Sequence, residues 1–294
     1  MYRIIKVLNN NGILVLDVES RREVILLGNG IGFGHRTGER IESTGQAKRY
    51  ELVTGKTSAL QQVNSIEPVY IEAAGRIIEE AEGTMGVLSH DILIPMADHI
   101  ALAVSRAREG RELPNPFRHD IKALFSSEYQ SAMKGVAIIR ELTGVTISED
   151  EVGYITLHIH AGLSEENVAA AMDMARLVQD SMHQIESRMG FNLASDSLGY
   201  NRLASHVRYM IARARKGEPA GLDMQDYART SFPKPYEVAE KVCRDMEKRL
   251  GLPVAPEETG FLAIHIPVSY THLSQQWGGY HKRFPGCVFC KGGL

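Results

Sequence analysis

The chain has 294 residues, of which 44% are hydrophobic and 23% charged, with a formal net charge of −3 and three cysteines. These are the proportions of an ordinary globular protein, and no apolar run approaches the roughly 20 residues that a membrane span needs. The N-terminal residues lack the pattern of an export signal, and so few cysteines do not suggest a disulfide framework. We therefore expect a cytoplasmic protein with two or three domains.

Residues 1–56 predict a small all-β module. The runs "YRIIKVLNNNGILVLDV" and "REVILLGNGIGFG" are rich in Ile, Val and Leu and are broken by Asn and Gly, which is typical of short strands joined by turns. This segment holds nine Lys/Arg against six Asp/Glu, whereas the rest of the chain holds 24 against 30. A basic module on an acidic body is a common layout for nucleic-acid readers. Because so short a segment makes a marginal core, we expect it to dimerise.

The glycine-rich stretch "GNGIGFG" that begins at Gly28 does not fit a nucleotide-binding loop. No helix with an acidic residue follows at the required distance, and there is no Gly-Lys-Ser/Thr. An exposed turn remains, and it presents amides, an aromatic ring and basic charge suited to RNA. The residues concerned are Asn29, Phe33, His35 and Arg36, together with Asn9, Asn10 and Asn11. A plain hairpin, with Asn and Gly selected for turn geometry, is the alternative.

Beyond residue 65 the hydrophobic pattern becomes helical. Apolar residues recur at spacings of three and four in residues 68–82, 94–109, 129–144 and 168–190, and several of these segments end at Gly. In "SEDEVGYITLHIH" a serine precedes acidic residues, a good helix N-terminus that places Glu151, Ile155 and His158 on one face. This pattern predicts helical bundles.

The helical region is an internal duplication with an offset of 107 residues. The passage "DHIALAVSRAREG" from Asp98 recurs as "SHVRYMIARARKG" from Ser205, and "SEDEVGYITLHI" from Ser148 aligns with "APEETGFLAIHI" from Ala255. We expect two homologous all-α domains at residues 66–171 and 172–280, each with its own core because the period is far longer than that of a solenoid repeat.

Four histidines occupy equivalent positions in the two copies: His99, His158, His206 and His265. A single helical histidine is more often structural than functional, but two in each copy favour a function. Histidine can ligate a metal, act as general acid or base, or accept a phosphoryl group. The carboxylate or cysteine spacing of a metal site does not accompany them, and no Gly-x-Ser-x-Gly or partner for Cys243 indicates a hydrolase. Asp98 is a candidate to orient the imidazole of His99.

These segments together resemble the BglG-type transcriptional antiterminators of bacterial sugar phosphotransferase systems. "KVLNNNGILV" and "LLGNGIGFG" resemble the family's co-antiterminator RNA-binding domain, and "ADHIALAV", "NPF", "DEVGYITLHIHAGL" and "EETGFLAIHI" resemble its two phosphotransferase-system regulation domains. The match covers about residues 1–266, with the modules in family order, and "GIGFG" and "LHIHAGL" look most like the glucose-type branch.

The resemblance implies a function. A dimeric β module would bind an RNA hairpin in a leader transcript and thereby prevent a terminator from forming. The phosphocarrier protein or a sugar-specific transporter component would phosphorylate the four histidines. The family's RNA contacts map onto Asn9, Asn11, Gly28, Asn29 and Phe33, and Arg36 lies close by in the sequence. Asn29 departs from the Arg or Lys usual there, which removes a cation near the phosphates. The resemblance implies neither an enzyme nor a cofactor.

The last residues depart from the family pattern. Residues 267–294 contain the only tryptophan and the pair Cys287 and Cys290 but no second cysteine pair for a metal site, so we expect a non-native or frame-altered end. Two other functions stay open. A DNA-binding activator with the same regulation domains would need a helix-turn-helix at its N-terminus, and a histidine phosphotransfer enzyme would pass phosphoryl groups to an acceptor without binding RNA.

Overall fold

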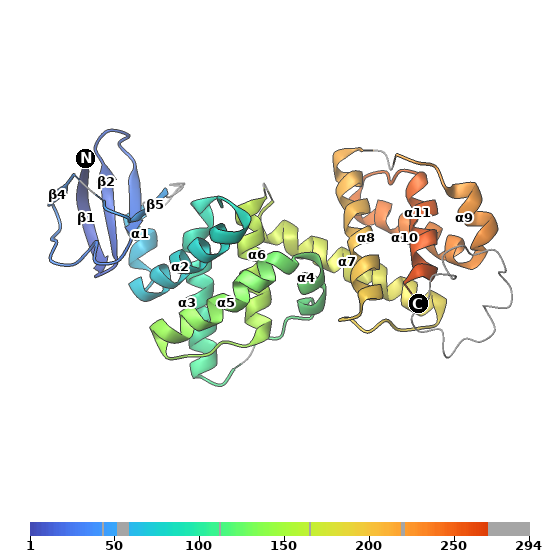
Figure 1. Ribbon diagram of the computed structural model, residues 1–294, viewed down its shortest axis with the longest axis horizontal. Helices are drawn as coiled ribbons and strands as arrows, with labels where there is room; N and C mark the ends of the chain where they lie inside the picture. The colour runs from blue at the N-terminus through green and yellow to red at the C-terminus, as the bar shows by residue number, and fades with distance from the viewer. Residues whose placement is uncertain (43, 52–58, 112, 165, 219–220, 270–294) are drawn as a thin grey trace, which may run out of the picture. The chain divides into compact units, whose positions relative to one another are not determined.

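The computed structural model describes residues 1–42, 44–51, 59–111, 113–164, 166–218 and 221–269. The chain divides into two compact units, residues 1–173 and 174–294 (Figure 1). From residue 270 onward, the tail that the sequence sets apart lies outside the described residues. No helix in the described part of the chain is long and apolar enough to cross a membrane.

The first unit begins with the predicted β module. Its strands are β1 (Tyr2–Asn9), β2 (Gly12–Asp17), β3 (Glu23–Leu27), β4 (Arg40–Ile41) and β5 (Lys48–Glu51). They form one antiparallel sheet in the order β4-β1-β2-β3-β5. Asn9 pairs with Gly12, so Asn10 and Asn11 form the turn between β1 and β2, as the sequence predicts.

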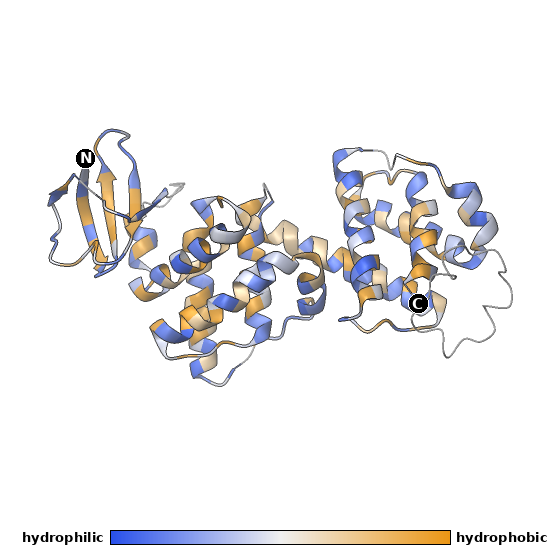
Figure 2. Cartoon of the chain, viewed as in Figure 1, coloured by the Kyte–Doolittle hydropathy of each residue, from blue (hydrophilic) through white to orange (hydrophobic). Residues whose placement is uncertain are grey.

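The two faces of the sheet enter different hydrophobic clusters, because successive side chains of a strand point in opposite directions. Ile13 and Val15 of β2 belong to a cluster made within the β module. Leu14, between them, belongs with Tyr50 to the core of the helices that follow. Figure 2 shows these central strands as a strongly hydrophobic part of the chain. The chain's own helices therefore cover one face of the sheet and add to the small core of the β module.

The helices of the first unit form a bundle. They are α1 (Ala59–Asn64), α2 (Pro68–Met85), the 3-10 turn η1 (His90–Ile92), α3 (Leu93–Arg108), α4 (Arg118–Leu124), α5 (Ser126–Thr143) and α6 (Glu149–Leu163). Helix α2 packs on α3 and α5, and α6 packs on α3, α4 and α5. Ser148 precedes α6 as predicted, but its side chain makes no capping hydrogen bond, so the acidic first turn provides the N-terminal stabilisation.

The second unit repeats this design. The division between units falls within α7 (Val168–Met189), and α8 (Leu198–Lys216), α9 (Gln225–Ser231), α10 (Pro233–Leu250) and α11 (Glu257–Val268) follow. Helix α11 packs on α8, α9 and α10, as α6 packs on α3, α4 and α5 in the first unit. The structure thus confirms a small β module followed by two homologous helical bundles.

Candidate functional site

The first unit brings two of the predicted histidines together. His99 lies on α3 and His158 on α6, and their ring centroids are 5.6 Å apart. The His158 residue is only 8% exposed, whereas the His99 side chain is 15% exposed and so offers the more accessible ring of the pair. Helix packing therefore creates a pair from residues 59 positions apart in the sequence.

A carboxylate and a guanidinium flank this pair. His99 Nε2 lies 3.1 Å from Glu151 Oε2, and Arg106 donates two hydrogen bonds to the same carboxylate at 2.8 and 3.0 Å. Burial opposes ionisation of Glu151, but His99 and Arg106 outweigh it, so the pKa of Glu151 is lowered. The expectation that Asp98 orients His99 is wrong: Asp98 is exposed, and the carboxylate beside the ring comes from α6.

The His158 imidazole is held neutral. Burial, reinforced by the neighbouring His99, lowers the pKa of His158 to about 3. Its Nδ1 atom is buried and has no hydrogen-bond partner among the described residues. A neutral imidazole has a nitrogen lone pair, which nucleophilic attack on a phosphoryl group requires.

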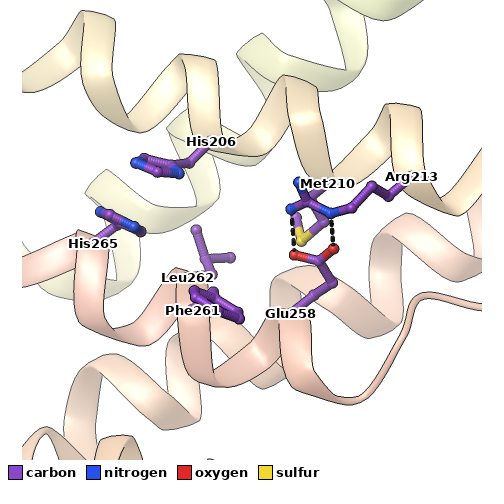
Figure 3. Close-up of a pocket in the computed structure, with 7 residues that line it drawn as sticks. All are labelled: His206, Met210, Arg213, Glu258, Phe261, Leu262 and His265. Carbon is purple, nitrogen blue, oxygen red and sulfur yellow. Dashed lines mark hydrogen bonds and ion pairs between the residues drawn. The ribbon is translucent and has the colours of Figure 1, made fainter. Parts of the chain in front are cut away.

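The second unit contains the equivalent pair beside a cavity. His206 of α8 and His265 of α11 stack with ring centroids 3.3 Å apart and an interplanar angle of 20°. Arg213 donates to Glu258 at 2.5 and 2.8 Å, as Arg106 does to Glu151 (Figure 3). The cavity has a volume of about 200 Å³, and its lining consists of His206, Met210, Arg213, Glu258, Phe261, Leu262 and His265.

Both imidazoles of this second pair are also neutral near pH 7. Burial lowers the pKa of His265 to about 4, and Arg202, together with His206 when that ring is protonated, acts in the same direction. Burial also lowers the pKa of His206, with Arg202 and Arg213 contributing. The two units therefore share a group of two histidines, one arginine and one glutamate in the same chain order.

The sequence pointed to the histidines but not to the role of the arginine and glutamate. The repeat offset of 107 positions also relates Arg106 to Arg213 and Glu151 to Glu258. The duplication therefore marks these residues as equivalent, as it does the histidines. Only the fold shows that each arginine is paired with its glutamate beside the histidines. Among the described residues, no group of three or more His, Cys, Asp and Glu side chains is placed to hold a metal ion.

Three of the predicted RNA-contact residues, Asn9, Asn11 and Gly28, lie at the β1–β2 turn. The backbone N–H of Gly28 donates to the Asn11 carbonyl at 2.9 Å, and that of Gly30 donates to Asn11 Oδ1 at 3.0 Å. Gly32 passes so near Asn9 that a Cβ there would lie 2.1 Å from the Asn9 carbonyl oxygen. The glycine-rich loop is thus docked on the turn, and glycine at position 32 is required for the close approach.

Three of the candidate RNA contacts are open to solvent. Phe33 is 73% exposed, which is unusual for a large aromatic side chain, and Asn29 and Arg36 are exposed as well. Asn9 and Asn11 are different, because their amides donate to Glu72 of α2 at 2.7 and 2.9 Å. Nothing in the sequence pattern predicts this contact between the β module and the first helical bundle.

Family models match both regions of the chain that carry these residues. A family model described as the CAT RNA binding domain matches residues 2–59, and one described as the PRD domain matches residues 72–162 and 179–268. An antiparallel β module that binds RNA and two helical domains with paired histidines define a regulatory RNA-binding protein. The chain belongs to the family of antiterminators that join a CAT RNA-binding domain to two PRD domains, which are regulators and not enzymes.

Three antiterminators of similar sequence span about nine tenths of the chain or more. The GlcA/glcB genes antiterminator of Staphylococcus carnosus is 29% identical, with 94% of this chain and 96% of the relative covered. The PtsGHI operon antiterminator of Bacillus subtilis is 29% identical, with 89% and 94% covered. The Beta-glucoside operon antiterminator of Dickeya chrysanthemi is 26% identical, with 93% and 99% covered. The crystal structure of GlcT CAT-PRDI is 32% identical and covers 55% of this chain and 98% of its own, with a TM-score of 0.48.

Proposed function

We propose that this chain is a cytoplasmic antiterminator that binds an RNA hairpin in the leader transcript of a sugar operon. The β module acts as a homodimer, and the hairpin it stabilises excludes an overlapping terminator. Asn9, Asn11, Gly28, Asn29, Phe33 and Arg36 form the RNA contact. Phe33 supplies an exposed ring for stacking on an unpaired base, and the amides read base edges.

The four histidines are the phosphoryl acceptors in this proposal. The observation that carries it is the recurrence, in both units, of two adjacent imidazoles beside an arginine–glutamate pair. Because the rings of His158, His206 and His265 are neutral near pH 7, each has a lone pair for attack. A ring nitrogen bonds to phosphorus, and the bond to the donor breaks with its electron pair left on the donor. The proton released by the acceptor ring restores the donor.

The donors are the phosphocarrier protein and a sugar-specific transporter component. Each phosphorylation adds nearly two negative charges beside Glu151 or Glu258. A carboxylate 3.1 Å from the ring of His99 repels those charges, whereas Arg106 attracts them, so the arginine–glutamate pair must rearrange. This rearrangement is the event that changes the behaviour of the domain.

The proposal assigns each function to one segment of the chain. Residues 1–56 form the RNA-binding domain, 66–171 the first regulation domain and 172–280 the second. The segment 267–294 is an atypical end to the second domain.

Phosphorylation in vitro tests this function. The full chain is incubated with the general phosphotransferase proteins, the phosphocarrier and phosphoenolpyruvate, with and without a sugar-specific transporter domain. Phosphohistidines are then mapped by mass spectrometry under conditions that preserve the acid-labile bond. We expect label on His99, His158, His206 or His265 and none on exposed His119. Label confined to other histidines would overturn the assignment.

A further inference from the structure

Glu72 holds two of the amides that the proposed function assigns to RNA recognition. Its two carboxylate oxygens accept from Asn9 Nδ2 at 2.7 Å and from Asn11 Nδ2 at 2.9 Å. The amide oxygens are also engaged, since Asn9 Oδ1 accepts from the Asn11 backbone and Asn11 Oδ1 from that of Gly30. The orientation of both amides is therefore fixed, with donors directed at a carboxylate.

This contact is part of a packed junction between α2 and the sheet. Gly75 of α2 lies so close to Leu27 that a Cβ would come within 2.3 Å of it, and the hydroxyl of Tyr50 donates to the Gly75 carbonyl at 3.1 Å. Lys48 of β5 forms an ion pair with Glu82 near the other end of the helix. Glu72, Gly75 and Glu82 are spaced so that they share one face of α2, which is the face against the sheet.

Lys6 of the β module also donates a hydrogen bond to a helix of the first bundle. Lys6 Nζ of β1 donates to Asn64 Oδ1 of α1 at 2.6 Å. Three donors on or next to β1, those of Lys6, Asn9 and Asn11, thus have acceptors on α1 and α2. An RNA backbone or base edge also offers acceptor atoms to such donors, and the phosphates, like Glu72, carry negative charge.

We propose that Glu72 competes with RNA for the amide donors of Asn9 and Asn11, so that α2 controls access to the RNA-binding surface. The inference depends on the proposed function of these two asparagines. The amide hydrogen that each asparagine donates to Glu72 is not free to bind an RNA acceptor at the same time. The negative charge of Glu72 also repels nearby phosphates. RNA then binds only those molecules in which Glu72 has released the two amides. The apparent affinity equals the intrinsic affinity multiplied by the fraction of molecules in this released state.

Binding kinetics of full-length variants test the competition. The probes are leader RNA hairpins of the glcA gene and of the ptsGHI operon, because these genes name two of the relatives. The variants are Glu72→Gln, which keeps one weaker acceptor, and Glu72→Ala, which keeps none. Glu80→Gln is the matched control, since Glu80 lies on the same helix but pairs with Lys134 of α5 at 2.6 Å. Thermal unfolding of each variant confirms that it is folded.

We expect affinity to increase in the order wild type, Glu72→Gln, Glu72→Ala, with Glu72→Ala roughly tenfold tighter, which corresponds to about 1.4 kcal/mol. The gain should be in the association rate, and Glu80→Gln should match wild type. Equal affinity of wild type and both Glu72 variants would overturn the competition, and weaker binding of the variants would show that Glu72 positions the amides for RNA instead. Asn9→Ala and Asn11→Ala keep the two proposals distinct. If neither lowers affinity, the RNA assignment of these residues fails and the competition fails with it.

Discussion

Arg106 and Glu151 form a two-bond ion pair next to His99, and Arg213 and Glu258 form the same pair next to His206. Both glutamates are almost completely buried. A buried carboxylate without its partner carries an uncompensated charge, so each pair behaves as a unit. The duplicated pair links the helix that bears the first histidine of each domain to the helix that bears the second.

Removing either arginine should therefore destabilise its own unit. We expect Arg106→Met to lower the free energy of unfolding of the first unit by roughly 2–4 kcal/mol, because Glu151 would be left buried and unpaired. Arg213→Met should do the same in the second unit. Urea unfolding followed by hydrogen exchange, which separates the units, measures both. The exposed pair of Arg244 and Glu240 is the control, and Arg244→Met should cost less than about 1 kcal/mol.

Acid should destabilise the first helical domain through His158. The pKa of this residue is about 3 in the folded chain because of burial, whereas an unfolded histidine titrates near 6.5. Below pH 6.5 the unfolded state therefore binds a proton that the folded state does not, and stability falls as the pH falls toward 3. The loss between pH 6.5 and pH 5 should be roughly 2 kcal/mol.

A pH series of unfolding experiments measures this slope. His158→Gln removes the titrating group and should flatten the acid side of the stability profile of the first unit. Exposed His119→Gln should keep the wild-type profile. An unchanged slope in His158→Gln would contradict the assignment of the acid sensitivity to this buried ring.

Phe33 should contribute to RNA affinity without contributing to the fold. Because the side chain is 73% exposed, Phe33→Ala should leave the melting temperature unchanged. If the ring stacks on a base, the same variant should lose roughly 1–3 kcal/mol of binding free energy to a leader hairpin. Gel shifts over a salt series measure this loss. Tyr227→Ala, at an exposed aromatic residue of the second unit, should bind as wild type does.

Gly32 should be necessary for the shape of the RNA-binding surface. An alanine Cβ would lie 2.1 Å from the Asn9 carbonyl oxygen, so Gly32→Ala forces the loop away from the β1–β2 turn. We expect a loss of RNA binding with a smaller loss of stability, measured by gel shift and thermal unfolding. Gly83→Ala is the control, since a Cβ in this part of α2 meets no atom within 4 Å. It should raise helix stability by about 0.5–1 kcal/mol and leave RNA binding intact.

Local patterns in the sequence account for most of the fold. The β-branched runs and the Asn-Gly turns predict the sheet, and the spacing of apolar residues predicts the helices, because both reflect interactions between near neighbours in the chain. The offset of 107 residues identifies the four histidines. It does not show that His99 faces His158, since that depends on how α3 packs on α6.

The contacts that the sequence did not predict all join distant segments. Glu72 is 63 positions from Asn9, and Glu151 is 52 positions from His99. No periodicity relates residues so far apart, and adjacency in the chain, the only relation that the sequence gives, points to Asp98 and not to Glu151 as the partner of His99. Pairing of charges across helices is a property of tertiary packing, which one sequence without its fold does not reveal.

If the paired histidines control RNA binding by the β module, phosphorylation must change the affinity of the full chain for a leader hairpin. The decisive measurement is this affinity before and after phosphorylation by the phosphotransferase proteins. The variant with His99, His158, His206 and His265 all changed to Ala is measured in parallel. We predict a change in wild-type affinity of roughly 5- to 150-fold and no change in the variant. An equal change in both proteins, or no change in fully phosphorylated wild type, would show that the histidines do not control RNA binding.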